Sequence, residues 1–401
     1  MIAKVKRTDL LLKLPLEVIN LFTIFGQEIR MVGGAVRDLL LDRQVKDFDF
    51  ATTHTPNQIK EILSNNNIKY VDLAEKFGTI IAVIDGKNFE ITTLRQEYEY
   101  NGRHCLVKFT NDFYEDAKRR DFTINALYMD KDGLIYDYFD GVFDLEQKKI
   151  RFIGDANLRI KEDYLRILRF FRFSALFYQN INQQNLKACI AQQQNLLKLS
   201  KSRIREEFLK IIAVNNLDNL YKILKILQDN NFCQTLFGKN LQLDNFIKIN
   251  DLANKLSFNL SQNLKIAILF VDSKLRLDRL KDDLNLTKSE YQYLKFFVNN
   301  LNCSLKDQFF EILARNDVNL VKEFYIYCQT TQESATIINE IKQVLDFLEK
   351  YAIAKFPLNG NDILRLGFKN EEIGEILKKC KVAWLRSNLS LTKVDLLKLI
   401  D

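Results

Sequence analysis

The chain has 401 residues, which is too long for one typical hydrophobic core and predicts about two to four domains. Hydrophobic residues make up 47% of the sequence, as in globular proteins, and no apolar run approaches the ~20 residues that a membrane-spanning helix needs. The formal charge of +7 is modest for this length, so it permits an anionic partner without requiring one.

The cysteines and the N-terminus indicate the compartment. Six cysteines are widely scattered without a CxxC pair, and only two histidines accompany them. This pattern argues against a zinc site and a disulfide framework and favours a reducing cytosol. Residues 1–22 lack a secretory apolar core and cleavage site, so they are expected to form a folded helix. We therefore expect a cytoplasmic protein with no membrane segment.

Residues 31–50 contain the strongest site signal. An apolar run ends in two glycines, an amphipathic helix is predicted over 35–41, and a polar turn leads to a strand with Asp47 and Asp49. Because alternate residues of a strand face the same side, the two carboxylates are expected to point together while phenylalanines pack behind them. Carboxylates beside a glycine turn and a helix N-terminus make a site for a divalent metal and a phosphate. The alternative is a strand with an acidic solvent face.

Two further signals follow in chain order. A strand predicted over 89–95 carries Glu90, a candidate third carboxylate for the metal site. The triplet Arg119-Arg120-Asp121 comes ahead of a predicted apolar helix. Adjacent arginines bind triphosphate oxygens or a nucleic-acid backbone, and a carboxylate accepts hydrogen bonds from a ribose. A charged helix N-terminus is an equally good interpretation of this triplet by itself.

The helix predicted over 155–178 contains a row of charged residues. Asp163 and Arg166 are three residues apart and are expected to share a helix face, and Arg169 and Arg172 continue the row. A pair at this spacing is usually a simple salt bridge. Arginines among so many apolar residues either extend to the surface or line a wet cleft.

The fold class is predicted from where glycines and strand-like runs occur. Nine of the 13 glycines lie before residue 155, together with the strand-like runs, whereas the later sequence is mostly helical in period. A helix is predicted to begin after a cap at Ser200. The expected fold is therefore an α/β N-terminal part followed by an all-α remainder.

Six ordered motifs resemble those of one known family. They are GGAVRD, DFDF, RRDFTINALY, DYFDG, EDYLRILRFFRF and SKSRIREEF (200–208). In this order they resemble class II tRNA nucleotidyltransferases and bacterial poly(A) polymerases, densely over residues 28–210. The sequence over 93–121 also resembles the CCA-adding branch found in α-proteobacteria and mitochondria.

The resemblance implies an architecture and roles for single residues. It implies a β-polymerase-like nucleotidyltransferase head (1–150) and a helical neck (151–215), body (216–345) and tail (346–401). By position, Asp47 and Asp49 match the metal aspartates, and Gly34 and Arg37 match triphosphate contacts. The resemblance assigns nucleotide binding to Arg120 and to a helix that carries Asp163, Arg166, Arg169 and Arg172. Glu162 is expected to hold the arginine of that helix in place.

The chemistry of these residue types agrees with nucleotidyl transfer. Paired carboxylates hold the metal ions, expected to be Mg²⁺, that activate a 3′-hydroxyl and neutralise departing pyrophosphate. Gly33 and Gly34 let backbone amides approach the triphosphate. Cytosine and adenine both present an amino donor beside a ring-nitrogen acceptor, which Asp163 next to Arg166 would complement. One protein face could thus accept CTP and ATP without a template.

The expected function is addition of CCA to the 3′ end of tRNA, with the body and tail binding the acceptor stem and TψC arm. A poly(A) polymerase, or an enzyme adding only CC or only A, shares every motif, although the retained residues 95–117 favour the complete reaction. A catalytically inactive RNA-binding protein is the alternative of another class, and the intact site residues argue against it. No obligatory protein partner is evident.

Overall fold

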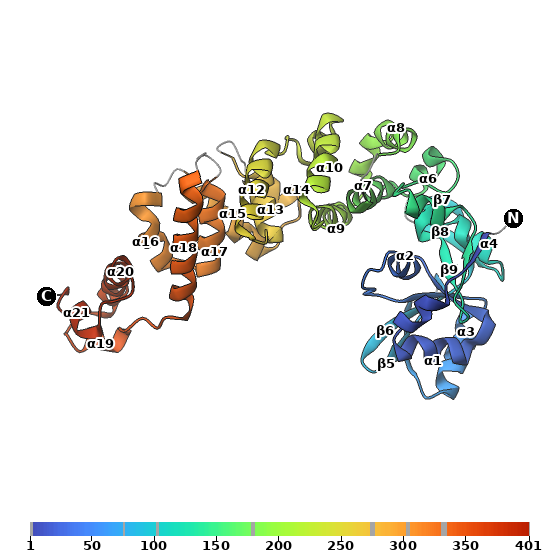
Figure 1. Ribbon diagram of the computed structural model, residues 1–401, viewed down its shortest axis with the longest axis horizontal. Helices are drawn as coiled ribbons and strands as arrows, with labels where there is room; N and C mark the ends of the chain where they lie inside the picture. Colours follow the sequence, from blue (N-terminus) through green and yellow to red (C-terminus); the bar gives the residue numbers. More distant parts are fainter. Residues whose placement is uncertain are drawn as a thin grey trace. The chain divides into compact units, whose positions relative to one another are not determined.

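The chain folds into two compact units, Met1–Ile223 and Leu224–Asp401, which run from blue to green and from green to red in Figure 1. Among the described residues, every strand lies in the first unit and the second unit contains helices. The predicted α/β part followed by a helical remainder is therefore confirmed. The computed structural model describes residues 3–74, 77–101, 104–177, 181–272, 277–301, 305–329 and 335–400.

An eight-stranded sheet organises the first unit. Its strands, in order across the sheet, are β1 (Ala3–Lys6), β10 (Leu134–Asp137), β9 (Leu127–Met129), β2 (Ile29–Val32), β3 (Asp49–Thr52), β6 (Lys87–Thr93), β5 (Thr79–Ile84) and β4 (Lys69–Ala74). Strands β3 and β6 run parallel, and the other neighbours are antiparallel. A separate hairpin is formed by β7 (Arg95–Asn101) and β8 (His104–Phe109).

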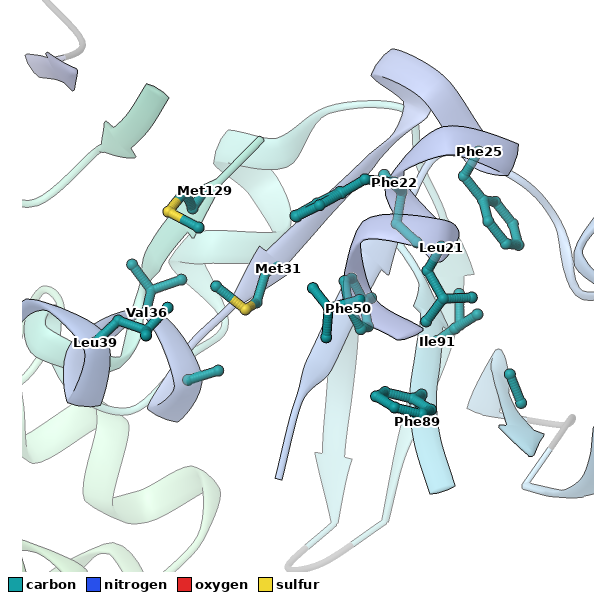
Figure 2. Close-up of a cluster of buried hydrophobic side chains, with 14 of the residues drawn as sticks. Leu21, Phe22, Phe25, Met31, Val36, Leu39, Phe50, Phe89, Ile91 and Met129 are labelled. Atoms are coloured by element: carbon teal, nitrogen blue, oxygen red, sulfur yellow. The ribbon is translucent and has the colours of Figure 1, made fainter. Parts of the chain in front are cut away.

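Three helices bury their apolar sides in one core with this sheet. They are α1 (Leu16–Phe25), α2 (Gly34–Leu40) and α3 (Pro56–Asn65), and α2 confirms the helix predicted over 35–41. Figure 2 shows Phe50 of β3 and Phe89 of β6 in this core. Replacing either ring with alanine should cost about 3–5 kcal/mol. The two rings anchor the strands that carry Asp49 and Glu90.

The apolar helix predicted after Asp121 is wrong. The chain instead forms a 3₁₀ turn over Thr123–Asn125 and then the central strand β9, between β10 and β2. A short apolar run does not distinguish a buried helix from a buried strand, because every side chain is apolar in both. Here the two neighbouring strands provide the hydrogen-bond partners that decide the outcome.

The single helix predicted over 155–178 is two helices, α6 (Ala156–Glu162) and α7 (Arg166–Phe177). Residue 178 lies outside the described residues. The predicted cap is confirmed, since Asp155 accepts the amide of Leu158 at 2.9 Å. At the break, the backbone of Asp163 is extended, and Nη1 of Arg166 donates to the carbonyl oxygen of Arg159 at 2.8 Å. In an uninterrupted helix that oxygen would accept the amide four residues later.

Further α-helices that begin in the first unit are α4 (Phe113–Lys118), α5 (Gly141–Glu146), α8 (Gln183–Ala191), α9 (Lys201–Ile212) and α10 (Leu217–Asp229). Ser200 is the N-cap residue of α9, as predicted, although its side chain makes no capping bond. Helix α9 packs against α7. The division between the units, after residue 223, falls within α10.

The second unit is built from helices. In the part of the chain that the structure describes, none of them is both long and apolar enough to cross a bilayer. The predicted domain boundaries at residues 150, 215 and 345 stay predictions. The helices are α11 (Phe232–Phe237), α12 (Leu243–Leu256), α13 (Gln262–Phe270), α14 (Leu277–Asp283), α15 (Lys288–Asn300), α16 (Leu305–Arg315), α17 (Val318–Cys328), α18 (Ala335–Ile353), α19 (Gly360–Leu364), α20 (Asn370–Arg386) and α21 (Lys393–Leu397).

Candidate active site

Two carboxylates lie side by side at the start of the parallel strand pair. Asp49 opens β3 and is in register with Glu90 of β6, and both side chains are exposed. The next residue of β3, Phe50, is buried in the core on the opposite face. Strand alternation therefore directs the two carboxylates away from that core.

Asp47 precedes the strand instead of belonging to it. Strand β3 begins at Asp49, so the prediction that both aspartates lie on one strand is wrong. Phe48 nevertheless packs against the core, with its ring centroid 6.4 Å from that of Phe89. This contact anchors the loop that carries Asp47, which is exposed. The carboxylates of Asp47 and Asp49 are close enough for their charges to interact.

The carboxylates affect one another electrostatically. Displacement of water by the surrounding protein raises the pKa of Asp49 to about 6; Glu90 and Asp47 add to this shift, and Arg120 opposes it. A bound cation would offset the repulsion between these carboxylates. Their oxygen atoms are ligands that suit a hard divalent ion. Within the described ranges, no three or more His, Cys, Asp or Glu side chains are grouped closely enough to hold a metal. Substrate phosphates would have to supply further ligands.

The chain turns sharply at Gly33, between β2 and α2. Its backbone has φ 72° and ψ −123°, a conformation that residues with a side chain rarely adopt. A Cβ atom there would lie 3.3 Å from Nη1 of Arg120 and 3.5 Å from the backbone oxygen of Asn125. Gly34 follows as the first residue of α2. The glycine therefore allows a close approach of Arg120 to the turn.

Arg37 of α2 is buried and held by several bonds. Its Nε and Nη2 donate to the two carboxylate oxygens of Asp38 at 2.9 Å each, and Nη1 donates to Oδ1 of Asn125 at 2.7 Å. The guanidinium carbon lies 5.2 Å from the ring centroid of Phe173 in α7. Arg37 thus connects α2 to the turn after Asp121 and to α7.

Asp116 of α4 (Phe113–Lys118) holds the two adjacent arginines. It is 1% exposed and accepts from Nε of Arg119 at 2.9 Å, from Nη2 of Arg120 at 3.3 Å and from the hydroxyl of Tyr128 at 2.7 Å. Burial alone would raise the pKa of Asp116, but the two guanidinium groups and the Tyr128 hydroxyl lower it to about 2. Both arginines are therefore fixed by one buried carboxylate.

Asp121 links the same segment to α7. Its Oδ1 accepts from the amide of Phe122 at 2.8 Å and from Nδ2 of Asn125 at 3.1 Å, and its Oδ2 accepts from Nε of Arg169 at 2.7 Å. Burial would raise the pKa of Asp121, but the charge of Arg169 and the Asn125 bond lower it to about 2. A ribose hydroxyl that donates to Asp121 would share the carboxylate oxygens of Asp121 with these partners.

Glu162, the last residue of α6, holds two arginines. Its Oε2 accepts from Arg159 and, at 2.5 Å, from Nη1 of Arg166. Arg166 also donates from Nη2 to the carbonyl oxygen of Arg119 at 3.3 Å. Arg159 in turn donates to the carbonyl oxygens of Arg119 and, at 2.6 Å, Arg120. These contacts fix the guanidinium of Arg166 between α6 and the segment that follows α4.

Asp163 lies in the break between α6 and α7 and has different partners. Its Oδ1 accepts from the amide of Leu165 at 3.1 Å, and its Oδ2 accepts from Nη2 of Arg203 at 2.8 Å. The prediction that Asp163 and Arg166 share a helix face is therefore wrong. The helix ends before Asp163, and the charge of Arg166 is paired with Glu162.

Arg172, the last arginine of the row, meets Glu207 of α9. The distance from its Nη1 to Oε1 of Glu207 is 3.2 Å, and Nη1 of Arg169 lies 4.0 Å from the same oxygen. Burial lowers the pKa of Arg172, and the negative charge of Glu207 opposes this shift. Glu207, which is 3% exposed, thus contacts two of the three arginines of α7, Arg169 and Arg172.

Sequence reasoning found the arginines and Glu162, which contacts Arg166, but missed several other residues that hold the arginines and Asp163. Arg203 and Glu207 lie four residues apart in the motif at 200–208, to which no role was given. The other missed residues are polar groups in short charged or apolar runs, where the sequence does not reveal their partners. The full set is Asp116, Asn125, Arg159, Arg203 and Glu207.

The chain is similar to one family of proteins along most of its length. The poly A polymerase head domain matches residues 29–151, which include the carboxylates and every strand of the sheet except β1. The mitochondrial CCA tRNA nucleotidyltransferase 1 of Homo sapiens is 34% identical over 393 residues, covering 95% of this chain and 88% of that protein. This match spans both units.

Solved structures show the same fold. The Thermotoga maritima CCA-adding enzyme in complex with tRNA has a TM-score of 0.74 and 21% identity, with 100% of this chain and 99% of that chain covered. The Bacillus stearothermophilus CCA-adding enzyme in complex with CTP has a TM-score of 0.72 and 22% identity, with 93% of each chain covered. Together with the identity to the human enzyme, which extends over both units, these matches show that the chain belongs to the family of CCA tRNA nucleotidyltransferases, the CCA-adding enzymes.

Proposed function

We propose that this chain adds CCA to the 3′ end of tRNA, using CTP and ATP without a nucleic-acid template and releasing pyrophosphate at each addition. The observation that carries this proposal is 34% identity to a CCA tRNA nucleotidyltransferase over 95% of the chain. The paired carboxylates, the glycine turn and the row of held arginines are the groups that nucleotidyl transfer to a hydroxyl requires.

Asp47 and Asp49 are proposed to hold the metal, with Mg²⁺ as the working ion. Nucleotidyltransferases of this kind generally use divalent metals. Mg²⁺ prefers oxygen ligands and is usually bound by one or two carboxylates together with substrate phosphates. When bound, the ions would activate the 3′-hydroxyl and neutralise the pyrophosphate. Glu90, in register with Asp49, is proposed as an additional carboxylate for this site.

The triphosphate and ribose are proposed to bind between the glycine turn and the arginines. Gly33 leaves room for Arg120 beside the turn, and backbone amides next to glycine can approach phosphate oxygens. Asp116 and Glu207 support this proposal because they fix the arginine side chains, which reduces the entropy lost on binding. The proposed contacts are Gly33, Gly34, Arg37, Arg119, Arg120, Asp121, Arg169 and Arg172.

Asp163 and Arg166 are proposed to read the base. The carboxylate would accept from the amino group of cytosine or adenine, and the guanidinium would donate to the adjacent ring nitrogen. Uracil and guanine present a carbonyl and an N–H instead, so both contacts would become unfavourable. Each group is held by its own partner, Arg203 or Glu162, so neither is neutralised by the other.

The helical remainder is proposed to bind the acceptor stem and TψC arm by shape and phosphate contacts. In this proposal the neck (151–215), body (216–345) and tail (346–401) follow a catalytic head (1–150). A cytoplasmic location is proposed because Cys189, Cys233 and Cys380 are free thiols, as in a reducing compartment.

A poly(A) polymerase is the second candidate, because the head-domain family that matches residues 29–151 is named for that activity. Both activities use the same carboxylates and arginines, so the site does not separate them. Enzymes that add only CC or only A, and a catalytically inactive RNA-binding protein, are distinguished by the same experiment.

The experiment uses pure protein and a tRNA transcript that lacks its 3′ terminus. With CTP, ATP and MgCl₂, our proposal expects three added nucleotides, and CTP alone should give two. Extension of an oligo(A) primer into a long ladder would instead identify a poly(A) polymerase. A product that stops after CC, or a requirement for a CC end, would identify a partial enzyme. Bound but unextended tRNA would identify an inactive RNA-binding protein.

A further inference from the structure

Helix α9 brings two opposite charges to the proposed nucleotide site. Arg203 and Glu207 are four residues apart and so lie on one face of the helix. Arg203 contacts Asp163, and Glu207 contacts Arg169 and Arg172. One face of α9 therefore supports both the proposed base-reading carboxylate and the arginine row.

The contact with Arg203 restrains a side chain that has little other support. Asp163 is outside both helices, with φ −150° and ψ 109°. Its Oδ1 accepts one bond, from the amide of Leu165 at 3.1 Å, and its Oδ2 accepts one, from Arg203 at 2.8 Å. A carboxylate has about four lone-pair directions, so acceptor capacity remains on both oxygens. The side chain of Asp163 is 28% exposed and that of Arg203 only 19%.

We propose that Arg203 is a positioning residue that sets base selectivity. It holds the carboxylate of Asp163 in the orientation that accepts the amino group of cytosine and adenine. This inference rests on the proposed base-reading role of Asp163. Because Arg203 acts through that carboxylate, its loss changes which nucleotide is incorporated more than it changes how tightly any triphosphate binds.

Glu207 provides the contrast within the same helix. Its partners, Arg169 and Arg172, are proposed to contact phosphates, which are the same in every nucleotide. The loss of Glu207 should therefore raise KM for all four triphosphates alike and leave their relative use unchanged. Alternatively, the salt bridge between Arg203 and Asp163 only attaches α9 to the segment before α7. Its loss would then lower the melting temperature and leave nucleotide selectivity unchanged.

The test measures single-nucleotide incorporation and thermal melting on the full chain. CTP is compared with UTP on tRNA lacking CCA, and ATP with GTP on tRNA ending in CC. Arg203→Gln should lower both ratios of kcat/KM by roughly 5- to 20-fold, which is part of the discrimination of a bidentate base contact. Arg203→Lys keeps the charge and should retain an intermediate ratio. Glu206→Gln, at an exposed neighbour on α9, is the matched control and should behave as wild type.

A double variant shows whether Arg203 acts through Asp163. In an Asp163→Ala background, Arg203→Gln should produce no further fall in the CTP/UTP ratio, because the positioned group is already gone. Unchanged ratios in both Arg203 variants, beside an altered ratio in Asp163→Ala, would overturn this inference alone. An unchanged ratio in Asp163→Ala would overturn the base-reading role itself. Absence of addition by the wild-type protein would overturn the proposed function.

Discussion

The pKa of Asp49 reflects the burial and the neighbouring charges at the site. Its folded-state pKa of about 6 lies above the ordinary value of 3.8, because water is displaced around it and Glu90 and Asp47 carry like charges. A group whose pKa is raised on folding binds protons more tightly in the folded state, so its contribution to stability falls as pH rises from about 4 to 6. The ionised carboxylate thus destabilises the metal-free protein at neutral pH.

Asp49→Asn should therefore raise the melting temperature in the presence of a chelator near pH 7.5. The gain should be on the order of 1 kcal/mol or less, because water screens an exposed carboxylate. Near pH 5 the wild-type group is largely protonated, so the difference between the proteins should shrink. Thermal melts at both pH values test this, and an equal gain at both would contradict the pKa assignment.

The same two aspartates should be indispensable for catalysis. Asp47→Ala and Asp49→Ala should each abolish addition of C and of A while leaving tRNA binding largely intact, because the carboxylates act on the metal and not on the tRNA body. Extension assays and a binding assay on the same preparations measure both properties. Near-normal turnover in either variant would show that the metal assignment is wrong and would shift attention to Glu90.

Gly33 should resist substitution for a backbone reason. Its φ of 72° and ψ of −123° are sparsely populated by residues with a Cβ atom, so Gly33→Ala should cost about 1–3 kcal/mol. Gly374 in α20 has no atom within 4 Å of an added Cβ, so Gly374→Ala should stabilise by about 0.5–1 kcal/mol. Urea unfolding compares the two. A Gly33→Ala protein as stable as wild type would contradict the strained turn.

At the scale of elements, local signals in the sequence were sufficient where a segment's own residues decide its structure. The helix after Gly33 and the cap at Asp155 were predicted because glycine turns and capping carboxylates act on their neighbours. The break between α6 and α7 was not predicted, because the apolar periodicity continues across it and does not show that the backbone of Asp163 is extended. The roles of Arg203 and Glu207 were missed for a different reason: their partners Asp163 and Arg172 lie 40 and 35 residues away in the sequence.

Helix α4 depends on the buried carboxylate of Asp116, whose partners Arg119, Arg120 and Tyr128 follow it by 3, 4 and 12 residues. The pKa of this buried carboxylate is lowered to about 2, so its stabilising contribution is fully present above about pH 4 and is lost only as pH falls toward 2. Asp116→Asn should therefore destabilise the protein by about 3 kcal/mol, because two arginines lose their buried counter-charge.

The loss of stability in Asp116→Asn should be the same near pH 5 and pH 8, whereas the gain expected for Asp49→Asn depends on pH. Chemical denaturation at the two pH values measures it. Glu115→Gln, on the same helix, is the control, since its ion pair with Lys118 is long at 4.0 Å and should contribute little. A loss of stability no larger than that of the control would contradict the role of Asp116 in holding the two arginines.

At the scale of the whole molecule, tRNA binding should be electrostatic, because a helical surface that grips the acceptor stem neutralises phosphates. Each neutralised phosphate releases counterions, so affinity should fall at least tenfold between about 50 and 200 mM salt. Filter binding or fluorescence anisotropy across this range measures the slope. A flat dependence would show that the proposed tRNA contacts are not made to the backbone.

The pairing of β1 with β10 has a consequence for how the protein is made. Strand β1 forms one edge of the sheet beside residues 134–137, so this edge depends on a contact between distant parts of the sequence. Such contacts form slowly, because a long loop must be ordered before the pairing stabilises it. During synthesis the sheet cannot be completed until β10 has left the ribosome, and Asp163 gains Arg203 only after α9 has emerged. A nascent chain therefore acquires the carboxylates proposed to hold the metal well before the helix proposed to set the choice of nucleotide.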